Sequence, residues 1–155
     1  MYHLRRVHRI SRPRSEVFAF FADAANLEAL TPPFLAFHIE TPLPIAMRPG
    51  AIIEYRMRLY GLPVRWRTEI EAFEPGESFV DNQVRGPYRV WRHEHRFRDT
   101  EDGGTEMTDH VAYELPLPPF GRVAHPVVRR MLRGIFDYRC RVIAERFGVA
   151  TTRRT

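Results

Sequence analysis

The sequence has a single cysteine, Cys140, and contains no lysine, so all 24 of its basic residues are arginine. One cysteine can neither form an internal disulfide nor supply the paired cysteines of a zinc ribbon. No apolar run approaches the roughly 18 residues of a membrane-spanning helix. The N-terminal residues lack the apolar centre of a secretory signal. These absences predict a cytoplasmic protein without a transmembrane segment.

The net charge of +5 and the pI of about 10.0 raise nucleic acid as a possible partner. An all-arginine composition, however, is as typical of a biased genome as of a selected basic patch. Many arginines also alternate with acids on expected outer strand faces, as in Glu54, Arg56 and Arg58. There is no recognition helix, zinc finger or aromatic-basic sheet signature. We therefore expect no nucleic-acid partner.

A chain of 155 residues suits one domain, which we place at 1–148, followed by a flexible C-terminal tail at 149–155. The hydrophobic periodicity predicts an α+β protein whose strands are joined by short turns and are therefore antiparallel. A wide apolar face on the last helix indicates that it lies across the sheet. The expected elements are strands at 2–10, 35–41, 51–60, 63–74, 78–85, 89–98 and 105–115, short helices after Pro13 and at 24–30, and a helix at 120–147 in which Pro126 kinks or separates the first turns.

The strand at 89–98 places two histidines on its inward face. Side chains alternate along a strand, so His93 and His95 lie on the face marked as buried by Trp91 and Phe97. The same alternation on the adjacent strands turns further polar groups inward. The inward residues of these neighbours include Phe79, Asp81 and Gln83 on one side and Met107, Asp109 and Tyr113 on the other.

Arg139 lies near the middle of the apolar face of the last helix. A buried guanidinium without a partner costs several kcal/mol, so Arg139 requires a carboxylate, and Asp109 and Asp81 are the candidates. Two interpretations stay open. The cluster is either a structural ion pair between helix and sheet or the polar wall of a ligand cavity.

Three motifs resemble the bacterial ligand-binding proteins of the SRPBCC superfamily, which includes START domains, the major birch pollen allergen and polyketide aromatase/cyclases. The resemblance covers almost the whole chain. It implies a helix-grip fold, in which a curved seven-stranded antiparallel sheet wraps around a long C-terminal helix and two short helices follow the first strand. It also implies a cavity between sheet and helix. The motifs are Phe79-x-Asp81-x-Gln83-x-x-Gly86-Pro87-Tyr88-x-x-Trp91-x-His93-x-His95-x-Phe97, Gly104-Thr105-x-Met107-x-Asp109-x-Val111-x-Tyr113-x-x-Pro116 and Phe136-x-Tyr138-Arg139.

The function that we expect is binding of a hydrophobic or amphipathic small molecule, such as a lipid, quinone, sterol-like or polyketide-like compound, which the protein could transport or sequester. We expect no cofactor, and a monomer or a homodimer. The predicted ligand-binding residues are Tyr55, Met57, Trp66, Phe79, Asp81, Gln83, Trp91, His93, His95, Asp109, Tyr113, Met131, Ile135 and Arg139.

Catalysis and metal binding are two more specific alternatives. His93, His95 and Asp109 could perform general acid–base catalysis as in a cyclase, dehydratase or hydrolase. The same three residues could hold iron or zinc. Against a metal, the two imidazoles must converge on one point and Arg139 would compete for the Asp109 carboxylate. We therefore predict no metal site.

Overall fold

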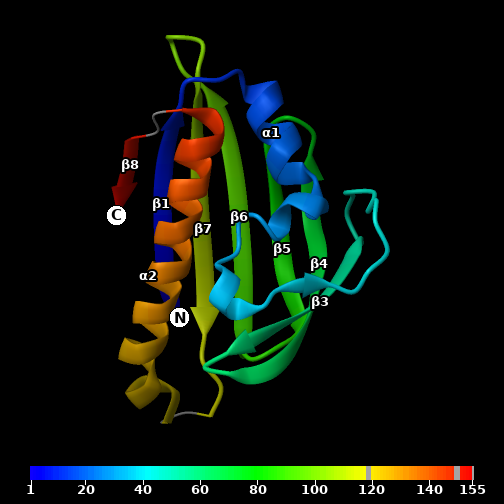
Figure 1. Ribbon diagram of the computed structural model, residues 1–155, viewed down its shortest axis with the longest axis vertical. Helices are drawn as coiled ribbons and strands as arrows, with labels where there is room; N and C mark the ends of the chain where they lie inside the picture. Colours follow the sequence, from blue (N-terminus) through cyan, green and yellow to red (C-terminus); the bar gives the residue numbers. More distant parts are fainter. Residues whose placement is uncertain (118–119, 149–150, 155) are drawn as a thin grey trace.

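The computed structural model describes residues 1–117, 120–148 and 151–154, and within them eight strands form one antiparallel sheet (Figure 1). The strand order is β2-β3-β4-β5-β6-β7-β1-β8. This confirms the seven predicted strands and adds an eighth at the β1 edge. The strands are β1 (Tyr2–Ile10), β2 (His38–Ile39), β3 (Ile52–Leu59), β4 (Leu62–Glu74), β5 (Ser78–Arg85), β6 (Val90–Asp99), β7 (Thr105–Glu114) and β8 (Thr151–Arg154).

The short elements after β1 differ from the sequence prediction. Helix α1 (Arg14–Ala22) begins after Pro13 as expected, but the helix predicted at 24–30 is only the 3-10 turn η1 (Ala24–Leu27). A second 3-10 turn, η2 (Pro33–Leu35), follows it. Side chains compete for backbone groups here, because Asn26 Nδ2 donates to the carbonyl of Phe20 and the Thr31 hydroxyl donates to that of Leu27. The strand predicted at 35–41 shrinks to β2 because its first residues belong to η2 and to a left-handed cap at Ala36.

Helix α2 (Phe120–Phe147) has the predicted bounds and runs through Pro126, so the first turns do not form a separate helix. Near its N-terminal end the predicted apolar face is partly solvent-exposed, since Val123 and Val127 are exposed. Farther along, Leu132, Phe136, Ile143 and Phe147 are buried. The second half of the helix therefore carries most of its packing.

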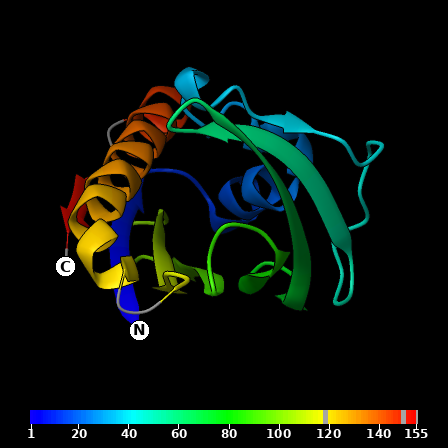
Figure 2. The ribbon, with the colours of Figure 1, turned by 90° about the horizontal axis from the view of Figure 1, so that it is seen from below.

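The sheet curves around α1 and α2, which lie on its concave side (Figure 2). Two register irregularities in β4, at Arg67/Thr68 and at Ile70/Ala72, interrupt its pairing with β5. Such bulges bend a strand and increase its twist. The curvature keeps β3 and β4 away from α2 and leaves an interior that side chains must fill.

The C-terminal segment 149–155, predicted as a flexible tail, includes a strand. Residues 151–154 form β8, which pairs with Arg6–Arg9 of β1. The edge strand β1 offers unpaired backbone groups, and β8 satisfies them. Residues 149–150 and 155 lie outside the described residues, as do residues 118–119 of the connection that precedes α2.

Candidate functional site: a cavity with a buried His/Asp cluster

Strand register brings two histidines and two carboxylates together on the concave face. On β6, His93 lies opposite Asp81 of β5, and His95 lies opposite Asp109 of β7. Residues directly opposite each other in an antiparallel pair share one face of the sheet. The two imidazole rings also lie against each other, with centroids 3.8 Å apart. The sequence prediction that these polar groups cluster is confirmed.

Asp109 is the buried centre of this cluster, with a side chain that is 0% exposed. Its Oδ1 lies 3.0 Å from Nε2 of His93, which is within hydrogen-bond distance, and 3.0 Å from Nδ1 of His95. Arg139 of α2 approaches the same oxygen, with Nη1 3.7 Å away. The sequence left the partner of Arg139 open between two carboxylates, and the structure assigns Asp109.

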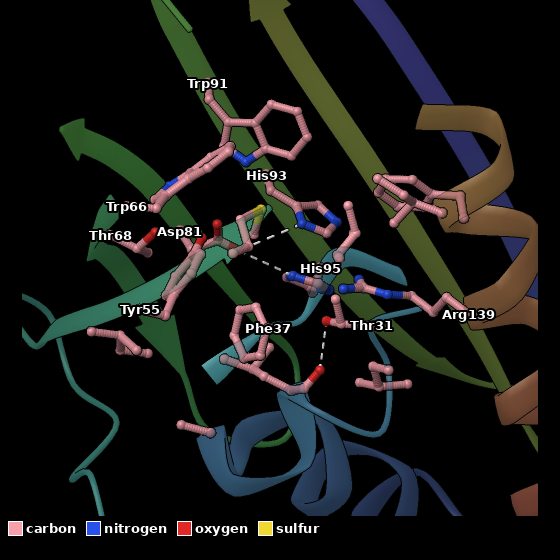
Figure 3. Close-up of a pocket in the computed structure, with 18 of the residues that line it drawn as sticks. Thr31, Phe37, Tyr55, Trp66, Thr68, Asp81, Trp91, His93, His95 and Arg139 are labelled. Carbon is pink, nitrogen blue, oxygen red and sulfur yellow. Dashed lines mark hydrogen bonds and ion pairs between the residues drawn. The ribbon is translucent and has the colours of Figure 1, made fainter. Parts of the chain in front are cut away.

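Asp81 contacts the opposite edges of the same two rings (Figure 3). Its Oδ2 lies 3.2 Å from Nε2 of His95 and 3.6 Å from Nδ1 of His93. The Asp81 side chain is 19% exposed, in contrast to Asp109. Each imidazole is therefore held between a fully buried carboxylate and one at the cavity wall.

The charges of the cluster follow from burial and from these contacts. Burial alone would raise the pKa of Asp109, but its contacts with three histidines, including His8, hold that pKa well below its ordinary value. Burial likewise opposes the ionisation of Asp81, yet His93 and His95 lower its pKa. Both carboxylates are therefore ionised.

The pKa values of the two histidines shift in opposite directions. Burial disfavours the imidazolium form of His95, but the carboxylates of Asp109 and Asp81 outweigh it and raise its pKa. Burial and the neighbouring His95 lower the pKa of His93. The imidazolium form is thus favoured at His95 and disfavoured at His93.

Two buried polar residues of β1 were not predicted. His8, which is 0% exposed, places Nε2 3.4 Å from Oδ2 of Asp109. Arg6, also buried, places Nη2 3.4 Å from Oδ1 of Asp137 on α2. Strand alternation contained the signal, because both residues share a face with Leu4 and Ile10, which are buried in the core.

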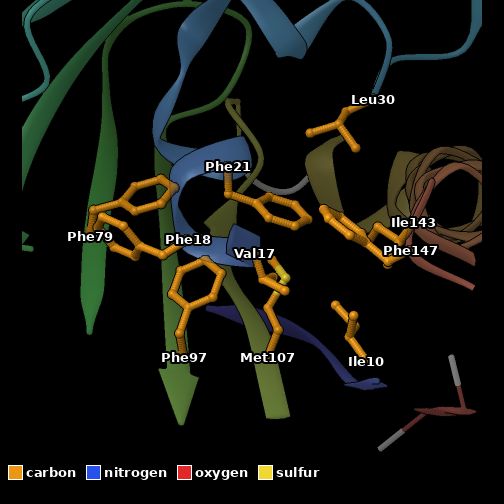
Figure 4. Packing of buried hydrophobic residues seen from close by; sticks show 10 residues of the cluster. All are labelled: Ile10, Val17, Phe18, Phe21, Leu30, Phe79, Phe97, Met107, Ile143 and Phe147. Atoms are coloured by element: carbon orange, nitrogen blue, oxygen red, sulfur yellow. The ribbon is translucent and has the colours of Figure 1, made fainter. Parts of the chain in front are cut away.

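The cluster forms part of the wall of a cavity of about 140 Å³ between the sheet, α2 and the segment around η1 and η2. Most of the lining is apolar. At one end the lining merges with an apolar cluster around α1, to which Phe21, Leu30 and Phe79 belong (Figure 4). The predicted site residues that line the cavity are Tyr55, Met57, Trp66, Phe79, Asp81, Trp91, His93, His95, Met131, Ile135 and Arg139.

Three residues predicted to bind ligand do not line the cavity. Asp109 lies behind the histidines. The Gln83 side chain donates from Nε2 to the backbone carbonyl of Tyr88 at 2.7 Å and so closes the turn between β5 and β6. The hydroxyl of Tyr113 lies 3.1 Å from Nε2 of His125 near the start of α2. All three side chains leave their strands on the inward face, but other side chains separate them from the cavity.

Sequence reasoning missed the part of the lining that comes from residues 21–47. The helix predicted at 24–30 and the strand predicted at 35–41 are replaced here by two 3-10 turns and a two-residue strand, so the predicted periods did not indicate which side chains point inward. The residues that it contributes to the lining are Phe21, Ala24, Leu27, Leu30, Thr31, Leu35, Phe37 and Met47.

Solved structures share this architecture. The Zhui aromatase/cyclase from Streptomyces sp. R1128 superposes with a TM-score of 0.73 at 12% identity, over 94% of this chain and 92% of that one. The protein TTHA0849 from Thermus thermophilus gives 0.68 at 21% identity, over 94% and 97%. A nucleoside-diphosphate sugar epimerase from Corynebacterium glutamicum gives 0.62 at 29% identity, over 92% of this chain and 28% of that one. The protein is thus an α+β protein of the helix-grip class, which agrees with the SRPBCC resemblance.

The chain belongs to the family described as a domain of unknown function, DUF8410, whose model matches residues 43–147. The comparison with curated proteins gives no match. Within the described ranges, none of the helices combines the length and the apolar character that a bilayer span requires.

Proposed function

We propose that the protein binds a compact, largely apolar molecule carrying an oxygen function in the cavity between the sheet and α2. The observation that carries this proposal is the cavity itself, an apolar space with one polar patch formed by Asp81, His93, His95 and Arg139. Apolar walls with a few convergent polar groups are typical of small-molecule sites, because the walls supply affinity and the polar groups fix orientation.

Arg139 supports an amphipathic ligand. Its side chain is only 12% exposed, and within the described residues no group accepts a hydrogen bond from Nε or Nη1. Buried donors are ordinarily paired, since an unsatisfied one costs about 1–3 kcal/mol or more when charged. A ligand oxygen in the cavity would accept from this guanidinium.

The cavity volume favours a ligand with a small ring system. A cavity of about 150 Å³ accommodates a benzene molecule, whereas drug-sized ligands occupy about 300 Å³ or more. Among the ligand classes predicted from the sequence, a quinone ring fits the cavity of about 140 Å³ as it stands. A sterol-like or lipid ligand would require the segment 24–47 to move outward.

Intrinsic fluorescence provides the test, because the only two tryptophans, Trp66 and Trp91, both line the cavity. Titration with 1,4-naphthoquinone should quench this emission saturably. Ile135→Phe, which fills part of the cavity, should weaken binding at least tenfold. The matched control is Val127→Phe, on the same helix but exposed to solvent, which should leave binding unchanged. Equal binding by both variants, or no saturable quenching, would contradict the proposal.

General acid–base catalysis is the second candidate, and the contact of Asp81 with His95 at the cavity wall, where the carboxylates raise the pKa of His95, favours it. In this arrangement Asp109 orients the histidines, while Asp81 and His95 face the ligand. The experiment is turnover of a β-hydroxyketone, for which His95→Gln should abolish dehydration while naphthoquinone binding persists. Equal turnover by this variant and the unmodified protein would exclude the candidate.

A further inference from the structure

We propose that Asp81, His93 and His95 form a binding site for a divalent transition-metal ion in the wall of the cavity. One nitrogen or oxygen atom of each residue lies within 4.8 Å of those of the other two. Two histidines and one carboxylate are a ligand set that holds iron(II) or zinc in proteins. This inference does not depend on the organic ligand proposed above.

The distances to Asp81 are those of atoms arranged around a common ion. Ligand atoms about 2.1 Å from a metal lie about 3.0–3.4 Å from one another, depending on the coordination geometry. Oδ2 of Asp81 lies 3.2 Å from Nε2 of His95 and 3.6 Å from Nδ1 of His93. All three ligand atoms lie within 4.8 Å of one another, so side-chain movement on binding would bring them to coordination distance.

Asp109 lies where metal sites commonly have a carboxylate that orients the histidine ligands. Histidines that bind a metal through one nitrogen usually donate from the other nitrogen to a carboxylate, which fixes the ring orientation and increases ligand basicity. Oδ1 of Asp109 lies 3.0 Å from the second nitrogen of both rings, Nε2 of His93 and Nδ1 of His95, and the contact has hydrogen-bond geometry at His93 but not at His95. The nitrogens that remain, Nδ1 of His93 and Nε2 of His95, are those that face Asp81.

The structure removes the two objections that the sequence raised against a metal. The imidazoles do converge, since Nδ1 of His93 and Nε2 of His95 both lie within 3.6 Å of the same Asp81 oxygen. Arg139 contacts the orienting carboxylate, Asp109, and does not occupy the one at the cavity wall. The carboxylate ligand is therefore Asp81, not Asp109.

The charge count indicates what else the ion would bind. With a divalent ion bound, the two carboxylates, the Arg139 guanidinium and two neutral imidazole ligands leave one net positive charge on the cluster. Three protein ligands leave coordination positions open toward the cavity. An anionic oxygen, such as a phenolate, an enolate or a carboxylate, would fill such a position and neutralise the excess charge.

Calorimetric titration of metal-depleted protein with zinc chloride tests the site. We expect one ion per chain with micromolar or tighter affinity, and visible d–d bands when cobalt(II) replaces zinc. Asp81→Asn should weaken zinc binding more than about 100-fold, because loss of an outer-shell partner alone costs 10–100-fold. Its partly exposed side chain makes this variant tolerable for folding, and near-UV circular dichroism checks that.

A surface pair of histidines provides the matched control. Nδ1 of His3 lies 3.1 Å from Nε2 of His110 on the outer face, where zinc could also bind. The double variant His3→Gln/His110→Gln should keep the stoichiometric site and its cobalt spectrum. The proposal is overturned if Asp81→Asn binds zinc as tightly as the unmodified protein, if only the surface variant loses binding, or if no stoichiometric binding occurs. Because no organic probe is present, these outcomes are independent of naphthoquinone binding.

Discussion

Nε2 of His93 lies 3.0 Å from Oδ1 of Asp109, and neither side chain is more than 6% exposed. Asp109 contacts His8, both β6 histidines and Arg139. Removing its charge should leave buried cations without compensation. We expect Asp109→Asn to lower the free energy of unfolding by about 3–5 kcal/mol, measured by urea denaturation.

The control for this variant is Asp99→Asn. Asp99 pairs with Arg14 at the surface, where its side chain is 64% exposed. Exposed ion pairs contribute about 0–1 kcal/mol, so this change should be nearly neutral. A loss below about 1 kcal/mol for Asp109→Asn would show that the cluster does not depend on the carboxylate charge.

The ion pair of Arg6 and Asp137 joins β1 to α2, and its two side chains differ in solvent exposure. The Arg6 side chain is 5% exposed and that of Asp137 is 40% exposed. Asp137→Asn would leave the buried Arg6 guanidinium without its carboxylate. Because the pair is partly solvated, we expect the free energy of unfolding to fall by about 1–2 kcal/mol. Arg6→Met removes the buried charge and keeps the bulk, so it should cost less. A larger loss for Arg6→Met in chemical denaturation would refute this interpretation.

The Gln83 side chain, which closes the β5–β6 turn, leaves no room for a side chain at Gly86. A Cβ built at Gly86 would lie 2.6 Å from Cδ of Gln83, whose amide bonds the backbone of Tyr88. Gly86→Ala should therefore displace that amide and cost about 1–2 kcal/mol through its lost hydrogen bonds.

A double-mutant cycle measures this coupling. In a Gln83→Ala background the obstacle is absent, and Gly86→Ala should cost about 1 kcal/mol less than in the unmodified protein. Additive thermal or urea destabilisation would mean that Gly86 is required for another reason.

Strand β8 can be tested by truncation. Removing residues 149–155 deletes the strand that pairs with Arg6–Arg9. At about 0.5–1.5 kcal/mol for each backbone hydrogen bond lost, we expect a loss of about 2 kcal/mol with the fold retained. Hydrogen exchange should show faster exchange of the β1 amides that face β8. Unchanged protection of these amides would favour the flexible tail expected from the sequence.

Periodicity predicted the features that repeat along the chain. Alternation placed Asp81, His93, His95 and Asp109 on one buried face, and the helical period turned Arg139 toward it. Short turns between apolar strands required antiparallel neighbours. Each of these results depends only on the direction in which a side chain leaves the backbone, which a local pattern fixes.

Local patterns did not predict the lining from residues 21–47, where the backbone changes conformation every few residues. They also assigned Gln83 and Tyr113 to the cavity, because an inward direction does not reveal whether a neighbouring group fills the space.

By itself, the sequence determined the order of the elements, the antiparallel sheet and the inward position of two histidines among acids. Only the tertiary structure decided which carboxylate lies behind the histidines and which one lines the cavity. Asp109 is fully buried behind the rings and Asp81 lies at the cavity wall, although both are inward residues of strands that flank β6. The physical reason is that sheet curvature, strand register and ring orientation arise from packing between distant segments, and these determine which nitrogen faces which oxygen.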